Sequence, residues 1–230
     1  MTYHLLLGDY AYSSWSLRGW LLFEVFGLQA ETSLTLLDTD EFADSLQAFF
    51  PARTVPALRM PEGVVIADSL AIAEELASRH PEAGHWPENP AARAVARALA
   101  GEMHSSFAAL RSHCPMNLRL SYSDCTPTRK VLDDLARIEQ LWDWARRTTG
   151  SAEPWLCGAY SAADAFFAPV AARIAGHNLP VSPASMAYVA AHLAHAPFRR
   201  WRQRALTEGP EKEIYRRNWP QRPWPEPAPG

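Results

Sequence analysis

The sequence predicts an α/β domain with the element order βαβαββα, followed by an all-α helical bundle. Two observations predict this division. Strand-like and helix-spaced apolar patterns alternate over the first eighty residues, whereas only helix-spaced patterns appear after residue 90. The segment between them contains Pro81, Gly84 and Pro87, which are typical of a linker. We therefore divide the chain into an α/β domain (1–80), a linker (81–89), a helical domain (90–208) and a proline-rich tail (209–230).

The α/β part is predicted from two apolar periods. Strands alternate apolar and polar residues, while helices place apolar residues three or four positions apart. Gly63 marks the turn of a hairpin, and Asp68-Ser69 marks the start of the helix that follows it. The elements expected in chain order are strand 3–8, helix 14–27, strand 31–37, helix 40–48, a hairpin over 55–67 and helix 69–79.

The helical part begins at Asn89-Pro90, where a capping side chain precedes proline at the first helical position. Apolar residues then recur at three-to-four-residue steps from Val95 to Cys114, which predicts one long helix. Thr126-Pro127 predicts the start of another. In the tail, Trp219 and Trp224 indicate that part of it packs back on the body. Further helices are expected over 162–177, 184–194 and 197–206.

Composition and charge exclude several classes of protein. The 230 residues are 48% hydrophobic and 20% charged, with a net charge of −3 and no run of like charges. Nucleic acid and anionic membranes are therefore not expected partners. The three cysteines are widely spaced, which predicts neither a disulfide framework nor a metal site. Because the sequence has no leader-like start and no long apolar stretch, we expect a cytoplasmic protein.

A serine-rich turn lies between the first predicted strand and the first predicted helix, and it reads Ser13-Ser14-Trp15-Ser16-Leu17-Arg18. The unpaired N–H groups and the positive dipole end of a helix N-terminus favour an anion at this place. A serine hydroxyl there would also donate to a thiolate and lower the pKa of the thiol. The alternative is that Ser13 or Ser14 only caps the helix, the commonest role of serine at this position.

Three other motifs occur further along the chain. Thr54-Val55-Pro56-Ala57-Leu58 lies at the start of the predicted hairpin, where proline alternatively only opens an edge strand. Asp68-Ser69 precedes the next helix and is also an ordinary helix cap. Ser161-Ala162-Ala163-Asp164 fits a capping box, in which the serine and the acid satisfy each other's backbone N–H groups.

The order and spacing of these four motifs over residues 1–205 resemble the cytosolic glutathione transferases. The serine turn is similar to the S-S-C-S-x-R signature of the zeta class, with Trp15 in place of the cysteine. The resemblance implies a thioredoxin-like fold for the α/β domain. It also implies that a serine lies beside the glutathione sulfur, with Ser13 as our first choice and Ser14 as our second.

The same resemblance implies how glutathione is bound. Pro56 would be cis, and the backbone of Val55 would contact the cysteinyl part of glutathione. Asp68 would pair with the γ-glutamyl ammonium group, and Ser69 would take the γ-glutamyl carboxylate. We place Trp15 with these glutathione-binding residues.

The second substrate is expected between the serine turn and the first long helix of the helical domain. On that helix, small and basic residues recur at helical spacing on the face opposite the apolar stripe. This face lies toward the cleft, a subunit interface or solvent. We expect His104 and Arg111 to bind substrate.

The resemblance implies a homodimeric glutathione transferase of the detoxifying kind. A serine-stabilised glutathione thiolate would attack a small electrophile, with glutathione as co-substrate and no metal. Two alternatives stay open from the sequence. One is a protein of this fold that binds ligands without chemistry, and the other is a glutathione-dependent cis-trans isomerase, which the Trp15 substitution disfavours.

Overall fold

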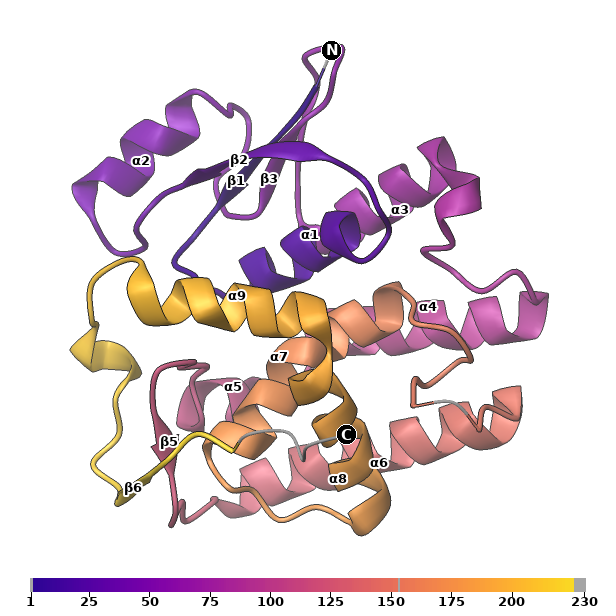
Figure 1. Cartoon of the computed structure of the whole chain (residues 1–230), viewed down its shortest axis with the longest axis vertical. Helices are drawn as coiled ribbons and strands as arrows, with labels where there is room; N and C mark the ends of the chain where they lie inside the picture. Colours follow the sequence, from indigo (N-terminus) through magenta and orange to yellow (C-terminus); the bar gives the residue numbers. More distant parts are fainter. Residues whose placement is uncertain (1, 153, 226–230) are drawn as a thin grey trace.

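The computed structural model describes residues 2–152 and 154–225, which form an α/β part and a helical part (Figure 1). The α/β part contains a mixed sheet in the order β2-β1-β3-β4. β1 pairs parallel with β2 and antiparallel with β3, which pairs antiparallel with β4. The predicted thioredoxin-like order βαβαββα is confirmed. The four strands are β1 (Tyr3–Leu7), β2 (Ala30–Leu34), β3 (Ala57–Arg59) and β4 (Val65–Ala67).

Helices cover both faces of this sheet. α1 (Ser14–Glu24) and α3 (Ser69–Arg79) lie on the face toward the helical part, and α2 (Asp40–Gln47) lies on the other (Figure 1). The alternation of β1 supplies both faces, because Leu5 and Leu7 belong to the main core and Leu6 to a small core under α2. α1 ends at Glu24 rather than at the predicted Gly27, which lies in the following turn with a φ of 68°.

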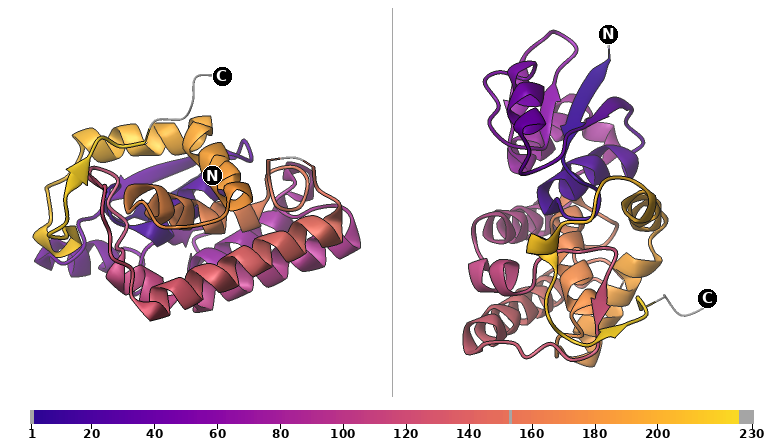
Figure 2. Two further views of the ribbon diagram at one scale, coloured as in Figure 1. Left: turned by 90° about the horizontal axis from the view of Figure 1, so that it is seen from below. Right: turned by 90° about the vertical axis from the view of Figure 1, so that its left-hand side faces the viewer.

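α7 (Ala162–Gly176) is the centre of the helical part (Figure 2). Every one of its residues is buried, and it packs against α1, α4 (Pro90–Ser105) and α8 (Pro183–Ala194). A helix that is apolar on all sides is one that other elements surround. The other helical segments are α5 (Ala108–His113), α6 (Arg129–Thr149), α9 (Ala196–Thr207) and the 3-10 turns η1 (Pro81–Ala83) and η2 (Glu213–Tyr215).

The predicted capping box opens α7. The Asp164 carboxylate accepts a hydrogen bond from the Ser161 N–H at 2.9 Å. The same buried carboxylate accepts from the Leu156 N–H at 3.2 Å and from the Tyr188 hydroxyl at 2.8 Å. Asp164 therefore ties together the start of α7, the preceding loop and α8.

The long helix predicted from residue 90 to residue 114 is wrong as a single element. It is interrupted at Phe107, whose φ of 64° is left-handed and whose side chain is buried in the core. The first turn of α5 is instead held from α6, because the Asp134 carboxylate accepts the Leu110 N–H at 2.9 Å. Apolar spacing continues across the break, so the periodicity of the sequence does not reveal it.

The tail also departs from the predicted pattern. Ser121–Tyr122 (β5) and Gln221–Arg222 (β6) form a short antiparallel pair, although no strand is expected after residue 90. The predicted packing of the tryptophans is confirmed, since Trp219 lies against His113 and Tyr122, and Arg202 lies over Trp224. Residues 226–230 of the predicted tail lie outside the described residues.

No helix within residues 2–152 and 154–225 combines the length and the hydrophobicity that a membrane-spanning segment requires.

Candidate active site

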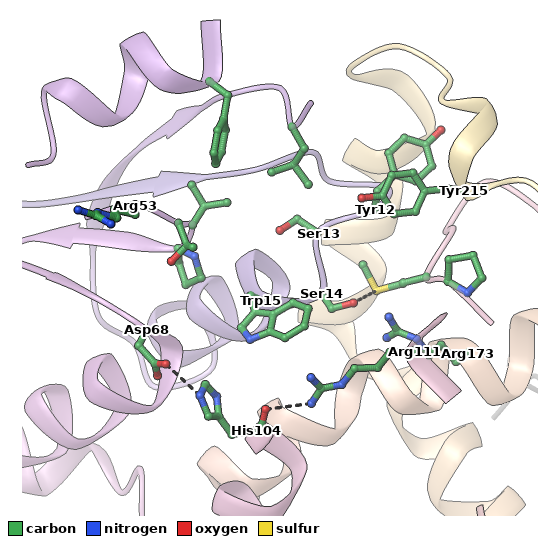
Figure 3. A pocket seen from close by; sticks show the side chains of 17 residues that line it. Tyr12, Ser13, Ser14, Trp15, Arg53, Asp68, His104, Arg111, Arg173 and Tyr215 are labelled. Atoms are coloured by element: carbon green, nitrogen blue, oxygen red, sulfur yellow. Dashed lines mark hydrogen bonds and ion pairs between the residues drawn. The ribbon is translucent and has the colours of Figure 1, made fainter. Parts of the chain in front are cut away.

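A cavity of about 610 Å³ lies between the α/β part and the helical part (Figure 3). Eight of the nine predicted site residues line it, although they come from segments up to a hundred residues apart. They are Ser13, Ser14, Trp15, Val55, Pro56, Asp68, His104 and Arg111. The ninth, Ser69, lies directly behind Asp68 and is fully buried.

Ser13 is the N-cap of α1. Its Oγ accepts the Ser16 N–H at 3.3 Å and donates to the Ser16 hydroxyl oxygen at 2.8 Å. Ser16 Oγ in turn accepts the Gly8 N–H at 2.8 Å, which links the cap to the end of β1. Both hydrogen-bonding functions of Ser13 therefore serve the local fold.

The Ser14 hydroxyl is engaged differently. It donates to Met116 Sδ at 3.7 Å, and Met116 lies directly beside the first turn of α1 (Figure 3). A thioether is a weak acceptor, so this hydroxyl can turn to a stronger acceptor at small cost. The Ser14 and Trp15 N–H groups belong to the first turn of α1, which has no acceptors for them within the helix. The Ser14 hydroxyl therefore already donates a hydrogen bond to a sulfur atom at this place.

Pro56 lies against the start of α1. The Val55–Pro56 bond is cis, as the family resemblance implies. Gly19 of α1 permits the contact, because a Cβ at residue 19 would lie 2.7 Å from Pro56 Cγ. The sequence therefore needs glycine at residue 19 to keep the Val55–Pro56 segment beside the serine turn.

Asp68 joins the two walls of the cavity. Its Oδ1 accepts the Leu70 N–H at 2.7 Å and caps α3, and its Oδ2 lies 2.9 Å from Nε2 of His104 on α4. Its φ of 86° is a conformation that non-glycine residues rarely adopt and that often occurs at ligand sites. Behind it, the buried Ser69 hydroxyl has no hydrogen-bond partner among the described residues.

Arginines gather around Trp15. The guanidinium groups of Arg18 and Arg111 lie 5.3 Å and 4.9 Å from its ring centroid. Burial lowers the pKa of Arg18 well below its usual value, and the positive charges of Arg111 and Arg173 lower it further. Burial, followed by Arg111, lowers the pKa of Arg173 to about 10. This end of the cavity therefore has a positive potential.

Several residues that line the cavity are not predicted as site residues from the sequence. Arg173 comes from the middle of α7, and Tyr215 comes from the tail, where its ring stacks on Tyr12 with centroids 4.6 Å apart. The turn after α5 supplies Pro115 and Met116. No local motif marks these positions, because distant segments bring them to the cavity. The other lining residues without a predicted role are Leu37, Phe42, Arg53 and Thr54.

The structure also groups two cysteines that the sequence spacing did not connect. Cys114 Sγ and Cys125 Sγ lie 3.9 Å apart, and with a ring nitrogen of His113 they form a set of donors within 4.8 Å of one another. Such donors could hold a soft metal ion. Burial raises the pKa of both thiols, so a metal would have to displace two protons.

Residues 12–79 match the family model of the glutathione S-transferase N-terminal domain. This segment is a glutathione S-transferase N-terminal domain. It contains the serine turn, Val55, Pro56, Asp68 and Ser69, so the matched segment spans the whole α/β wall of the cavity. The serine-type and zeta-like details of the resemblance stay predictions.

Solved glutathione transferases share the fold over about nine tenths of the chain. A glutathione transferase homologue from Burkholderia gl BGR1, with bound glutathione, is 22% identical, with a TM-score of 0.65 over 89% of this chain and 98% of that chain. Glutathione transferase Omega 3C from Trametes versicolor is 17% identical, with a TM-score of 0.66 over 93% of this chain and 92% of that chain. Omega 2S from Trametes versicolor, in complex with 2,4-dihydroxybenzophenone, is 22% identical, with a TM-score of 0.62 over 87% of this chain and 94% of that chain. Comparison with curated protein sequences gives no match.

Proposed function

We propose that this protein is a glutathione transferase in which the Ser14 hydroxyl stabilises the thiolate of bound glutathione. The hydrogen bond from Ser14 to Met116 Sδ carries the proposal. The donor of this hydrogen bond is a hydroxyl that lies at a helix N-terminus in the cavity wall. Its present acceptor is weak, so the hydroxyl can exchange it for a thiolate at small cost. Ser13 becomes the second choice, because its hydroxyl already caps α1 and donates to Ser16.

Glutathione would be held by the α/β wall. The backbone beside Pro56 would contact its cysteinyl part. Asp68 would pair with the γ-glutamyl ammonium group, and Ser69 would donate to the γ-glutamyl carboxylate. The Ser69 hydroxyl has no partner among the described residues, which supports this assignment, but it is enclosed, so the neighbouring Asp68 segment has to shift when glutathione binds.

The chemistry follows from charge. The helix N-terminus and the arginines around Trp15 favour the thiolate over the thiol, and the Ser14 hydroxyl adds a hydrogen bond to the anion. The thiolate attacks an electrophilic carbon, so that a C–S bond forms while a leaving group departs as an anion. The protein contributes positioning and electrostatic stabilisation without a covalent intermediate of its own.

The paired variants Ser14→Ala and Ser13→Ala test the proposal. The pKa of bound glutathione is measured from thiolate absorbance against pH. We expect Ser14→Ala to raise it by about 1–2 units, the value of one hydrogen bond to an anion. Ser13→Ala should leave that pKa near the wild-type value and should lower the free energy of unfolding by about 1 kcal/mol, the value of an N-cap.

An unchanged thiol pKa in Ser14→Ala would contradict the proposal. Glutathione that binds to the wild type without ionising would favour the ligand-binding alternative. Product formation without net consumption of glutathione would favour an isomerase. A homodimer rests on the family resemblance alone, and sedimentation equilibrium tests it. A cytoplasmic location rests on the sequence pattern alone.

A further inference from the structure

Two arginines on the helical wall of the cavity have no carboxylate within ion-pair distance among the described residues, although the more distant charge of Asp134 acts on Arg111. Arg111 comes from α5 and Arg173 from α7, and both lie at the end of the cavity where Ser14 meets Met116 (Figure 3). Within residues 2–152 and 154–225, neither forms an ion pair. Buried or half-buried guanidinium groups are normally paired, because their desolvation is costly.

The protein satisfies only part of each guanidinium group. Arg111 donates from Nη2 to the carbonyl oxygens of Met103 and His104, the latter at 3.0 Å. Arg173 donates from Nε to the Cys114 carbonyl at 2.9 Å and from Nη1 to the Pro169 carbonyl at 3.2 Å. These backbone bonds hold each side chain in place but bring no negative charge.

The remaining N–H groups are Nε and Nη1 of Arg111 and Nη2 of Arg173. They have no acceptor within the described part of the chain, and they are not among its enclosed unpartnered atoms. They are therefore accessible, and both side chains line the cavity. Burial lowers the pKa of both arginines, and for Arg173 the charge of Arg111 adds to the effect. An anion between them would offset that repulsion.

The cavity itself supplies no such anion. Among its lining residues the one carboxylate is Asp68, which lies on the other wall and is engaged by His104 and the Leu70 N–H. The surfaces next to the two arginines are apolar or aromatic: Trp15, Pro115, Met116 and Tyr215. An apolar wall with two cationic side chains at one end fits a ligand that has an unsaturated or aromatic body and one carboxylate.

We propose that the second substrate is a carboxylate-bearing electrophile, whose carboxylate Arg111 and Arg173 bind while its reactive carbon lies at the sulfur beside Ser14. This inference rests on the proposed glutathione transferase activity. In the proposed function Ser69, at the N-terminus of α3, takes the γ-glutamyl carboxylate, and Arg53 on the α/β wall is a cation that could take the other carboxylate of glutathione. Arg111 and Arg173 are thus left for the other substrate.

Two electrophiles of equal shape test the inference. They are 4-chloro-3-nitrobenzoate and 4-chloro-3-nitrobenzamide, which lose the same chloride to the thiolate and differ in charge. Each kcat/KM is divided by the rate of the uncatalysed reaction with glutathione, which removes their difference in intrinsic reactivity. We expect the wild type to favour the benzoate by about tenfold or more, the value of charge-assisted hydrogen bonds to one carboxylate.

Variants locate the source of that preference. Arg111→Met and Arg173→Met should each abolish most of it while the dissociation constant of glutathione stays within about twofold. Arg129→Met is the matched control, because Arg129 is exposed on α6 and pairs only with Asp133 among the described residues. If Arg173→Met does not fold, the benzoate preference is measured in Arg173→Lys and Arg111→Met instead.

Three outcomes would overturn the inference. Equal normalised rates for the benzoate and the benzamide would show that the cavity does not distinguish a carboxylate from an uncharged amide. A preference that survives in both arginine variants would place the carboxylate elsewhere. Loss of glutathione affinity in those variants would assign the arginines to glutathione. In each case conjugation of the benzamide by the wild type still reports on the proposed activity, so the two failures are distinguishable.

Discussion

The two walls of the cavity are built in opposite ways. The α/β wall takes its predicted site residues from three short motifs that lie at strand ends and helix starts: the serine turn, the Val55–Pro56 segment and Asp68-Ser69, beside which Leu37, Phe42 and Arg53 also line the cavity. The helical wall takes single residues from α4, α5, α7, the turn after α5 and the tail. Residues of the first wall offer short polar side chains together with backbone groups at helix termini. Those of the second offer long side chains alone.

This difference indicates how the site divides its tasks. Backbone groups at a helix N-terminus recognise an anion with little dependence on side-chain identity, so one arrangement serves a constant co-substrate. Isolated side chains can be exchanged without disturbing the fold that carries them, so they suit a substrate that differs between relatives. The proposed roles of the walls follow this division, with glutathione on the first and the electrophile on the second.

The largest expected effect tests the α/β wall. Asp68→Asn removes a charge but keeps the α3 cap, because asparagine caps a helix as well as aspartate does. We expect the dissociation constant of glutathione to rise about 10- to 100-fold, since the γ-glutamyl ammonium group loses its ionic partner. Isothermal calorimetry measures it, with the exposed Asp133→Asn on α6 as control. A change below twofold would remove Asp68 from the glutathione site.

A second prediction concerns the support of the helical wall. His177 is buried behind it, with Nε2 lying 2.9 Å from the Pro115 carbonyl. Burial lowers its pKa to about 4, below the value of about 6.5 in an unfolded chain. The unfolded state therefore binds one more proton between these pH values, and stability falls as pH decreases through this window.

The variant His177→Gln should lose this dependence. We expect the free energy of unfolding of the wild type to fall more steeply than that of the variant, by up to about 1.4 kcal/mol per pH unit between pH 6.5 and 4. Urea unfolding at several pH values measures both slopes. Other titrating groups are common to the two proteins, so parallel slopes would show that His177 binds its proton equally in both states.

The smallest expected effect concerns the tail. Tyr215 lines the cavity and stacks on Tyr12, so Tyr215→Ala opens the helical wall without touching the glutathione motifs. We expect the KM of the electrophile to rise about five-fold, the value of about 1 kcal/mol for an aromatic contact. Steady-state kinetics measures it beside Ile214→Ala, a change at the exposed neighbouring residue. A matching rise in the glutathione KM would contradict the division between the walls.

The sequence by itself determined the features that depend on neighbours along the chain. Apolar periods predicted the βαβαββα order and most helices, and the cap at Asn89 and the capping box at Ser161 were recognisable from three or four residues. The motifs of the α/β wall belong to this class, because a strand end followed by a helix start positions them almost without outside help.

Only the tertiary structure decided the remainder. Ser13 and Ser14 are equivalent in the sequence, yet Ser13 is engaged by Ser16 within the turn while Ser14 meets Met116, 102 residues away. The break at Phe107, the approach of Arg173 to Arg111 and the return of Tyr215 likewise depend on how α7 and the tail pack. Contacts of this kind arise from burial of the whole core, and no local pattern of residues encodes which distant side chains will meet.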